Sequence, residues 1–359
     1  MRVGLIIYGS IDTISGGYLY DRMLVEHLRR QGDHVEIISL PYQNYGQHLG
    51  HNVSRALYNR LREAHLDILL QDELNHPSLF WLNRRLKKHV DYPIVSIIHH
   101  LRFLETRAAW ENRFYRWIER LYLSNVDGFI CNSQTTRTAV KALAGTEKKS
   151  IVAYPGGNRL RNTIRFEQIS VRAQKPGPLQ IIFVGNLIER KRLHILLDAL
   201  TQLPPESWDL DVIGSLTADP IYVEYIRQQI TRYGLKEKVN LAGAVNDAEL
   251  AIRLTYSDVL VVPSSYEGFG IVYLEGMGFG LPAIASTAGA TNEIITHSQN
   301  GFLVPPDDPQ TLAKHIQILS DDRTCLLQMS MAARQHYETH PTWRDSTEHI
   351  REFMQTLVN

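Results

Sequence analysis

The sequence contains little cysteine and no long apolar run. Only Cys131 and Cys325 occur among its 359 residues, and their wide separation suggests neither a disulfide framework nor a zinc motif. No stretch approaches the roughly 18 consecutive apolar residues of a membrane-spanning helix. No apolar segment with a small-residue cleavage site precedes the first strand pattern, so no signal peptide is expected. These absences favour a reducing compartment and predict a cytoplasmic protein.

The chain also lacks net charge, but its charges are unevenly distributed. Residues 1–178 hold 25 Lys and Arg against 16 Asp and Glu, whereas residues 179–359 hold 13 against 22. This asymmetry indicates two domains with different partners. The basic half is compatible with an anionic acceptor or a membrane surface. It is equally compatible with solvated helix faces that merely differ between the domains. No nucleic-acid partner is expected.

Short apolar runs alternate with helical patterns along the chain, which indicates an α/β fold with parallel sheets. Residues 41–60 show no regular pattern, and residues 158–178 are polar and basic and end in Pro and Gly. We therefore expect 158–178 to be an irregular linker. Strands are expected at 3–8, 34–40, 66–71, 94–100, 126–133, 179–185, 210–214, 239–245, 258–262 and 280–286.

The most informative stretch follows the strand at 258–262. Pro263 ends the strand, and two glycines, Gly268 and Gly270, flank an aromatic residue just before a helical pattern. A relaxed backbone at a helix N-terminus presents N–H groups to an anion such as a phosphate. Glu267 and Glu275 lie eight residues apart, a spacing that lets two carboxylates hold two parts of one polar ligand. The alternative is a capped surface helix with incidental acids.

Three other loops follow expected strands, at the strand ends where α/β proteins bind ligands. Gly16 and Gly17 form the first βα turn, although no G-x-G-x-x-G fingerprint is present; the alternative is a turn that needs a positive φ. His99 and His100 end the strand at 94–100, and the alternative for them is a packing role.

The third loop is basic. Gly185 and Asn186 lead into Arg190 and Lys191, just before the next helix. Cations in this position suit a pyrophosphate, and the alternative is a solvated basic turn. The D-x-D pattern at 209–211 lies at the start of a strand rather than at its carboxyl end, so we do not assign it to a metal site.

The run from Glu267 through Gly268, Phe269, Gly270 and Ile271 to Glu275, followed by 280–285, resembles the donor-site signature of retaining glycosyltransferases of family GT4. The resemblance covers nearly the whole chain and is strongest over 181–308. It implies the GT-B fold, in which two Rossmann-like, doubly wound domains face a cleft. The expected parts are an N-terminal acceptor-side domain at 1–157, a linker at 158–178, a donor domain at 179–342 and a terminal helix at 343–359 that packs back on the N-terminal domain.

The resemblance also implies roles for individual residues. The donor sugar would meet His99 and Glu267, the diphosphate would meet Lys191, and the ribose would meet Glu275. His100 stands where many relatives have Asp, so either histidine remains a candidate for the active-site ring. Asn186 stands where the family has Arg, and we expect Arg190 or Arg192 to supply the missing charge at the diphosphate. Other donor contacts are expected from Gly16, Gly17, Gly185, Asn186, Gly268, Phe269, Gly270 and Ile271.

The activity implied is transfer of a sugar from a nucleoside diphosphate sugar to an acceptor hydroxyl, with retention of configuration. Neither a metal nor a cofactor other than the donor is expected. Two alternatives remain open, a sugar-nucleotide epimerase of similar fold and an inactive nucleotide-sugar-binding subunit. The acceptor and the donor base leave no recognisable side-chain pattern. A peripheral contact with the inner face of a membrane, through the basic N-terminal domain, is a further expectation.

Overall fold

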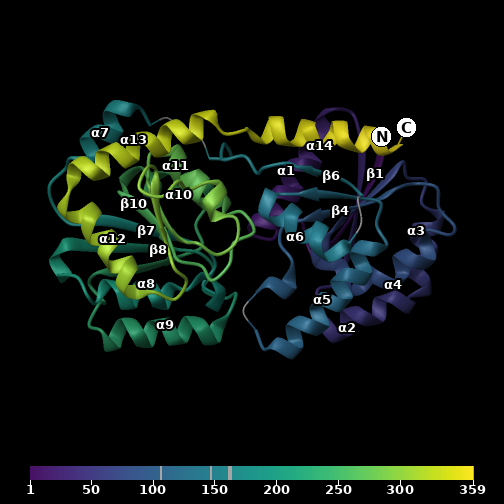
Figure 1. Cartoon of the computed structure of the whole chain (residues 1–359), viewed down its shortest axis with the longest axis horizontal. Coiled ribbons are helices and arrows are strands. Elements are labelled where there is room, and N and C mark those ends of the chain that lie inside the picture. Colours follow the sequence, from purple (N-terminus) through teal and green to yellow (C-terminus); the bar gives the residue numbers. More distant parts are fainter. Residues whose placement is uncertain (106, 146–147, 161–163, 359) are drawn as a thin grey trace. The chain divides into compact units, whose positions relative to one another are not determined.

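The computed structural model describes residues 1–105, 107–145, 148–160 and 164–358. The chain divides into two compact units, and each carries one six-stranded sheet. The first unit comprises Met1–Pro155 and Trp343–Asn359, and the second comprises Gly156–Thr342. Within each unit, helices cover both faces of the sheet (Figure 1). These sheets confirm the expected α/β fold with two doubly wound domains.

The first unit holds a parallel sheet in the order β2-β1-β3-β4-β5-β6. Its strands are β1 (Arg2–Tyr8), β2 (His34–Leu40), β3 (Ile68–Asp72), β4 (Ile94–Ile98), β5 (Gly128–Cys131) and β6 (Lys149–Val152). Its helices are α1 (Gly16–Arg30), α2 (Tyr45–Leu49), α3 (Arg55–Glu63), α4 (His76–Leu86), α5 (Ala109–Ser124), α6 (Gln134–Ala144) and α14 (Trp343–Val358), with 3-10 turns η1 (Gly50–Val53), η2 (Glu73–Asn75) and η3 (Arg102–Leu104).

The second unit holds a parallel sheet in the order β12-β11-β10-β7-β8-β9. Its strands are β7 (Leu179–Val184), β8 (Trp208–Ile213), β9 (Val239–Gly243), β10 (Val259–Val262), β11 (Ala283–Ser286) and β12 (Gly301–Val304). Its helices are α7 (Phe166–Ala173), α8 (Leu193–Leu200), α9 (Pro220–Arg232), α10 (Asp247–Tyr256), α11 (Ile271–Gly278), α12 (Pro309–Asp321) and α13 (Arg323–Thr339), with 3-10 turns η4 (Glu189–Lys191), η5 (Pro205–Ser207) and η6 (Thr291–Glu293).

Strand composition explains why both sheets are buried. β10 is apolar throughout and completely buried, and β3 and β4 are also buried along their whole length. Parallel strands that are covered on both faces read as continuous apolar runs rather than as alternating ones. The sequence pattern therefore located these strands correctly.

The strand order creates one switch point in each sheet. In the first unit it lies between β1 and β3, and in the second between β7 and β10. Loops that leave neighbouring strands at a switch point diverge to opposite faces of the sheet and open a crevice at the carboxyl ends. The loops after β7 and β10, and those after β1 and β3, are therefore where a ligand is expected.

The terminal helix α14 packs against α1 in the first unit. The Arg351 Nε atom lies 2.8 Å from Asp33 Oδ2, and His27 Nε2 lies 2.8 Å from Glu348 Oε2. The ring of Trp343, at the start of α14, lies edge-on to Tyr20 at 5.7 Å. The 16-residue helix α14 therefore belongs to the first unit, although the whole second unit separates it from the other residues of that unit in the sequence.

Two stretches differ from the sequence-based expectation. Residues 41–60 are not irregular, because they contain α2, η1 and the start of α3. The range 158–178 contains α7, on which Ile169 and Ala173 are buried; residues 161–163 of this range lie outside the described residues. Arg172 Nη1 donates to the carbonyl oxygen of Phe279 at 3.0 Å, so α7 is part of the second unit. A helix this short buries only two apolar residues one turn apart, and two positions are too few to show helical periodicity in the sequence.

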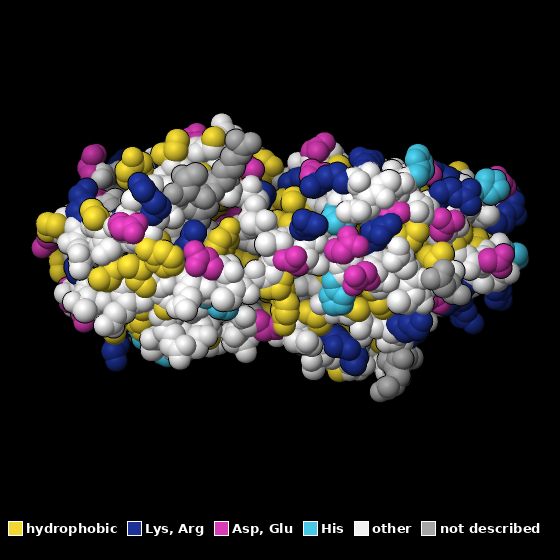
Figure 2. Space-filling model, turned by 90° about the horizontal axis from the view of Figure 1, so that it is seen from above, with side chains coloured by type: hydrophobic (Ala, Val, Ile, Leu, Met, Phe, Trp, Pro, Cys, Tyr) yellow, Lys and Arg dark blue, Asp and Glu magenta, His cyan; other side chains and the backbone are white. Residues whose placement is uncertain are grey.

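This boundary changes the charge argument. With residues 156–178 counted in the second unit, the first unit holds 22 Lys and Arg against 18 Asp and Glu, and the second holds 16 against 20. The face drawn in Figure 2 mixes basic and acidic side chains. The segment assigned to a linker, 158–178, holds 5 Lys and Arg against 1 Glu, so it accounts for nearly half of the apparent asymmetry. Among the described residues, no helix is both long and apolar enough to cross a membrane.

Candidate functional site

The first candidate site lies at the switch point of the second unit. β7 leads through η4 to Arg190 and Lys191, and β10 leads through Pro263 to Glu267. The two loops are joined by their backbones, because the N–H group of Ser265 donates to the carbonyl oxygen of Arg190 at 2.9 Å. Arg190 Nη1 in turn donates to the carbonyl oxygen of Tyr266 at 2.7 Å. Residues 76 positions apart are thereby held side by side.

Glu267 is the centre of this site. Lys191 Nζ donates to Glu267 Oε1 at 2.5 Å, and the hydroxyl of Ser264 donates to the same oxygen at 2.6 Å. Arg190 Nη1 lies 3.7 Å from Glu267 Oε2. The structure thus brings together three of the four residues for which we expected a catalytic role.

Burial and charge act in opposite directions on these groups. Burial alone would raise the pKa of Glu267, but the charges of Lys191 and Arg190 lower it to about 2. Burial lowers the pKa of Lys191, and Glu267 partly offsets that effect. Two cations against one carboxylate leave one net positive charge, which favours a further anion at this position.

A pair of glycines allows the chain to pass close behind Lys191. A Cβ atom added to Gly185 would lie 3.3 Å from Lys191 Cε. A Cβ atom added to Gly214, whose φ is +153°, would lie 2.0 Å from the carbonyl oxygen of Gly185. The side-chain oxygen of Asn186 accepts from the N–H group of Ser215 at 3.3 Å. Gly214 was not predicted from the sequence, because a glycine at the end of a strand is too common to indicate a close backbone contact.

The helix α11 begins next to Glu267. Its N-cap is Gly270 with a φ of +95°, and no acidic residue occupies its first turn. The first N–H groups of a helix, here those of Ile271 and Val272, have no partner within the helix. The side chain of Phe269 is 2% exposed, and its ring lies 5.9 Å from that of His340. The expected contact of Phe269 with the donor stays a prediction.

Glu275 lies in α11 but has its own partner. Arg159 Nε donates to Glu275 Oε1 at 2.8 Å, and Arg159 also pairs with Asp247. Burial raises the pKa of Glu275, and Arg159 partly offsets that effect. Among the described residues, no ion pair joins Glu275 to Glu267 or its partners, so the two carboxylates form separate charge clusters. Arg159 was missed because it falls in the stretch assigned to a linker.

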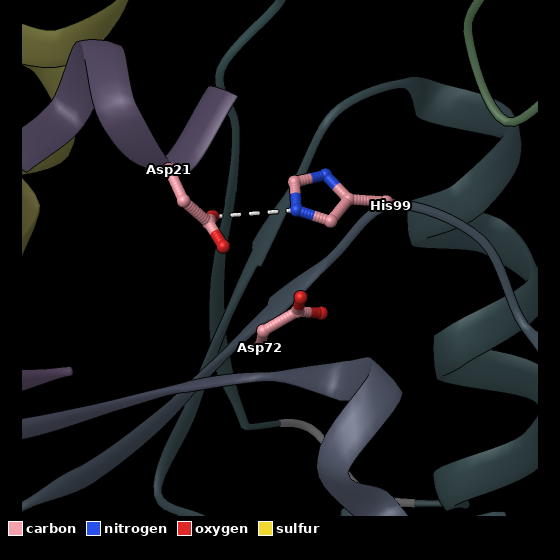
Figure 3. A group of neighbouring side chains, drawn as sticks. All are labelled: Asp21, Asp72 and His99. Carbon is pink, nitrogen blue, oxygen red and sulfur yellow. Dashed lines mark ion pairs between the residues drawn. The ribbon is translucent and has the colours of Figure 1, made fainter. Parts of the chain in front are cut away.

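The second candidate site lies at the carboxyl ends of β1, β3 and β4 in the first unit. His99 Nε2 faces Asp21 Oδ1 at 3.4 Å, and Asp72 lies beside this pair (Figure 3). A Cβ atom added to Gly17 would lie 3.0 Å from His99 Cδ2. Gly16 opens α1, which Ser15 caps by accepting from the N–H group of Tyr18 at 3.3 Å. The structure therefore brings the expected glycine turn and His99 together.

The two aspartates set the charge of His99. Burial alone would lower the pKa of His99, but Asp21, and to a smaller extent Asp72 and Glu73, raise it above its ordinary value. Burial and the charge of Asp21 raise the pKa of Asp72 to about 7. A charged imidazole between carboxylates is the arrangement that these shifts favour. Neither aspartate was predicted from the sequence, because Asp72 is a single acid at the end of β3 and Asp21 is a single acid within α1.

His100 has a different partner. His100 Nε2 lies 2.7 Å from Glu105 Oε1, and Glu105 also pairs with Arg107. His99, in contrast, contacts the turn that holds Gly17 and pairs with Asp21. His99 is therefore the better candidate of the two, and its role in sugar binding stays a prediction.

Two groups of buried side chains carry metal-ligand chemistry. The first is Asp21, Asp72 and His99, and the second is Glu73, His76 and Glu119. In the second group both ring nitrogens of His76 are already engaged, since one lies 3.0 Å from the carbonyl oxygen of Glu73 and the other 3.0 Å from the Tyr45 hydroxyl. In the first group His99 Nε2 faces a carboxylate, so the imidazole supplies the positive charge there.

The D-x-D pattern is satisfied by ion pairs. Asp209 Oδ1 lies 3.1 Å from Lys238 Nζ, and Asp211 Oδ2 lies 2.7 Å from Arg253 Nη1. Both aspartates belong to β8, which lengthens the sheet away from the switch point. Their carboxylates are explained by these partners.

Comparison with known proteins gives family matches in both units. The model of Glycosyltransferase Family 4 matches residues 19–158, and the model of Glycosyl transferases group 1 matches residues 165–336. An uncharacterised glycosyltransferase of Methanocaldococcus jannaschii is 28% identical over 353 residues, which cover 89% of this chain and 90% of that protein.

Two further relatives cover comparable lengths. A phosphatidyl-myo-inositol mannosyltransferase of Mycobacterium leprae is 26% identical over 87% of this chain and 86% of its own. The crystal structure of HepE from Anabaena, in complex with UDP-glucose, aligns with a TM-score of 0.79 at 22% identity. It covers 99% of this chain and 100% of its own, and at this identity the likeness concerns the fold.

Proposed function

The chain belongs to the group 1 glycosyltransferases of family GT4, and from this premise we propose that it moves a sugar from a nucleoside diphosphate sugar to an acceptor hydroxyl with retention of configuration. The observation that carries the proposal is the pairing of Lys191 with Glu267 beside Arg190, at the carboxyl ends of the two strands that flank the switch point. Family membership alone supports glycosyltransferase activity. The pairing of Lys191 with Glu267 supports the proposed position of the donor.

The diphosphate is the part of the donor that this site suits best. Lys191, Arg190 and Glu267 leave one net positive charge, and the first N–H groups of α11 add a partial positive charge next to it. Charge of this kind stabilises a leaving diphosphate as the sugar becomes cationic. Because the protein itself supplies the compensating charge, we propose that transfer proceeds without a bound metal ion.

The reaction is balanced without a protein nucleophile. The bond between the anomeric carbon and the diphosphate oxygen breaks, and a bond from the acceptor oxygen forms on the same face of the sugar. The acceptor proton passes to the departing diphosphate, so the products are a nucleoside diphosphate and the glycosylated acceptor. In this scheme His99 and Glu267 orient sugar hydroxyls. Asp21 pairs with the His99 ring, and Lys191 pairs with Glu267.

Glu275 is proposed to bind the ribose. Its carboxylate is buried and acts as a hydrogen-bond acceptor, and Arg159 occupies one of its two oxygens. The other oxygen is the one proposed for the ribose hydroxyls. A uridine nucleotide is the first donor to test, because HepE of Anabaena was crystallised with UDP-glucose.

Calorimetric titration of the purified protein with UDP, GDP and ADP tests the donor site, first without metal and then with Mg²⁺. We expect one nucleotide to bind clearly more tightly, and to do so without Mg²⁺. Binding that depends on Mg²⁺ would contradict the metal-free proposal. Absence of binding by all three would contradict the assignment of the site to these diphosphates.

Analysis of the product tests the rest of the reaction. Proton NMR of the anomeric signal should show that the product keeps the configuration of the donor sugar, and inversion would contradict the retaining mechanism. Incubation of the sugar nucleotide without acceptor separates the alternatives. Conversion to an epimer would indicate an epimerase, whereas binding without any product would indicate an inactive subunit.

The acceptor side is proposed to involve a membrane surface. A relative named as a phosphatidyl-myo-inositol mannosyltransferase suggests that lipid acceptors occur among similar proteins. The first unit holds a small excess of basic residues, which suits a peripheral contact with anionic lipid. The excess alone does not say which surface of the unit is involved.

A further inference from the structure

Helix α5 of the first unit exposes a row of aromatic side chains. Trp110 is 66% exposed, Trp117 is 57% exposed and Phe114 is 38% exposed. At 100° per residue these three positions fall within a sector about 60° wide on one side of the helix. Exposed aromatic residues that gather on one face of a helix often mark a surface that binds a protein or a membrane.

The buried side of the same helix lies well away from this row. Ile118, Tyr122 and Leu123 are the apolar residues that α5 buries in the core of the first unit. Their mean direction lies about 130° around the helix from that of the aromatic row. The aromatic row therefore lies outside the core that α5 helps to form. Phe114 is partly covered by Tyr45, whose ring lies 6.1 Å away, and the exposed part of the row remains in contact with water.

Three arginines border this row. Arg113, Arg116 and Arg120 are all exposed, and at 100° per residue they fall in a second sector about 60° wide, next to the aromatic one. Among the described residues none of them forms an ion pair, although the Arg116 guanidinium lies 5.7 Å from the Phe103 ring. Their charges are therefore not neutralised by carboxylates of the described chain.

The acids of α5 do not offset these cations on the exposed side. Glu119 is completely buried, and burial raises its pKa to about 8. Glu111 lies in the first turn, about 100° around the helix from the aromatic row and on the side away from the arginines. The exposed side of α5 therefore combines aromatic surface with uncompensated positive charge.

The basic cluster at the end of α4 is a weaker candidate. Lys87 is paired with Asp127, and the Arg85 guanidinium lies 4.7 Å from the Tyr58 ring. Trp81 is 48% exposed, but half of the four cations at 84–88 are engaged within the protein. The cluster fits a solvated helix end.

We propose that the exposed side of α5, formed by Trp110, Phe114 and Trp117 with Arg113, Arg116 and Arg120, docks onto the interface of an anionic lipid bilayer. This proposal rests on the proposed peripheral contact of the first unit and specifies its surface. Tryptophan favours the boundary between headgroups and acyl chains, and arginine next to it attracts anionic headgroups. Pairing with a second copy is disfavoured, because two such faces would bring rows of arginines together.

Vesicle sedimentation of the full chain tests the proposal. We expect the protein to bind phosphatidylcholine vesicles that contain about 30% phosphatidylglycerol, to bind pure phosphatidylcholine much less, and to be released by salt. Failure to bind the anionic vesicles would overturn the proposal.

Two double variants separate the aromatic and the basic contributions. Trp110→Ala with Trp117→Ala, and independently Arg113→Glu with Arg120→Glu, should each lower the partition coefficient at least about tenfold. The matched control is Ile221→Ala with Arg227→Glu on α9, where an exposed apolar residue and an exposed arginine lie on a helix of the second unit. This control should bind like the unchanged protein.

Two further outcomes would each contradict the assignment of the contact to α5. Loss of binding in Arg84→Glu with Lys88→Glu but not in the α5 variants would transfer the contact to α4. A change from dimer to monomer in the Trp variant, measured by light scattering, would identify the face as a contact between copies. Nucleotide titration of every variant shows that it is folded, and a protein that binds vesicles without binding any nucleotide would contradict the proposed donor site alone.

Discussion

Gly289 lies directly against the backbone of Glu267. A Cβ atom added to Gly289 would lie 2.0 Å from the carbonyl oxygen of Glu267, and the φ of Gly289 is +88°. The two residues form an isolated parallel bridge, and the N–H group of Ala290 donates to the Glu267 carbonyl at 2.9 Å. The loop after β11 therefore holds the backbone of Glu267 while Lys191 and Ser264 hold its carboxylate.

Gly289→Ala should consequently displace Glu267. A side chain at this φ costs roughly 1–3 kcal/mol, and the clash with a backbone atom adds to it. We expect the melting temperature to fall by at least about 3 °C and sugar transfer to fall at least about tenfold.

The control is Gly50→Ala, at a φ of −64° with open space around the added Cβ. It should change neither the melting temperature nor the rate. Equal melting temperatures and equal transfer rates in the two variants would show that the contact between Gly289 and Glu267 contributes to neither stability nor activity.

Lys191→Ala should reduce turnover more than binding. Removing a cation that stabilises a developing diphosphate charge typically lowers kcat about 100-fold to 1000-fold, and Arg190 still offers charge to the bound ground state. Steady-state kinetics and nucleotide titration of the same preparation measure the two effects separately.

The control cation for this experiment is Lys238, which pairs with Asp209 at 3.1 Å. Lys238→Ala removes a lysine from an ion pair away from the switch point, and it should leave kcat unchanged. Lys191→Arg keeps the charge and should recover part of the rate. An unchanged kcat in Lys191→Ala would contradict the proposed contact of Lys191 with the diphosphate.

Glu275→Ala should weaken nucleotide binding. A hydrogen bond to a charged group is worth about 1.5–3 kcal/mol, so the nucleotide Kd should rise at least about tenfold in calorimetry. Asp247→Ala provides the matched change, because it removes the other acidic partner of Arg159 but keeps the pair of Arg159 with Glu275. We expect it to change the Kd less than about twofold. Similar effects of both variants would mean that Glu275 acts only by holding Arg159.

Asp21→Asn should lower the pKa of His99. Burial lowers this pKa, and the charges of Asp21, Asp72 and Glu73 reverse that effect and raise it above 6.5. The stability that the raised pKa contributes is fully present below pH 6.5 and is lost as the pH rises through the folded-state pKa. The variant removes the largest of the raising charges, so its stability should depend less on pH in this range.

Histidine ring signals in NMR spectra measure this pKa directly, and His99→Ala identifies the signal. The comparison variant is Glu105→Gln, which removes the partner of His100 and not that of His99. Glu105→Gln should leave the pKa measured from the His99 signal unchanged. A His99 pKa that is the same in Asp21→Asn as in the unchanged protein would contradict the pairing.

The two sheets and the loops that carry the candidate site were predictable from the sequence for a physical reason. Buried parallel strands are continuous apolar runs, so β10 and β7 were visible as such, and the ligand-binding loops must follow their carboxyl ends. The motif from Glu267 to Glu275 indicated the family. The short helix α7 escaped because it buries only Ile169 and Ala173.

What the sequence by itself determined is the type of fold, the family and the identity of Glu267, Lys191 and His99 as candidates, because those signals are local. What only the tertiary structure decided is which residues meet them. Gly289, Arg159 and Asp21 lie 22, 116 and 78 positions from Glu267, Glu275 and His99. A contact across such a separation depends on the order of the strands in the sheet, and no pattern within one segment of the chain records that order.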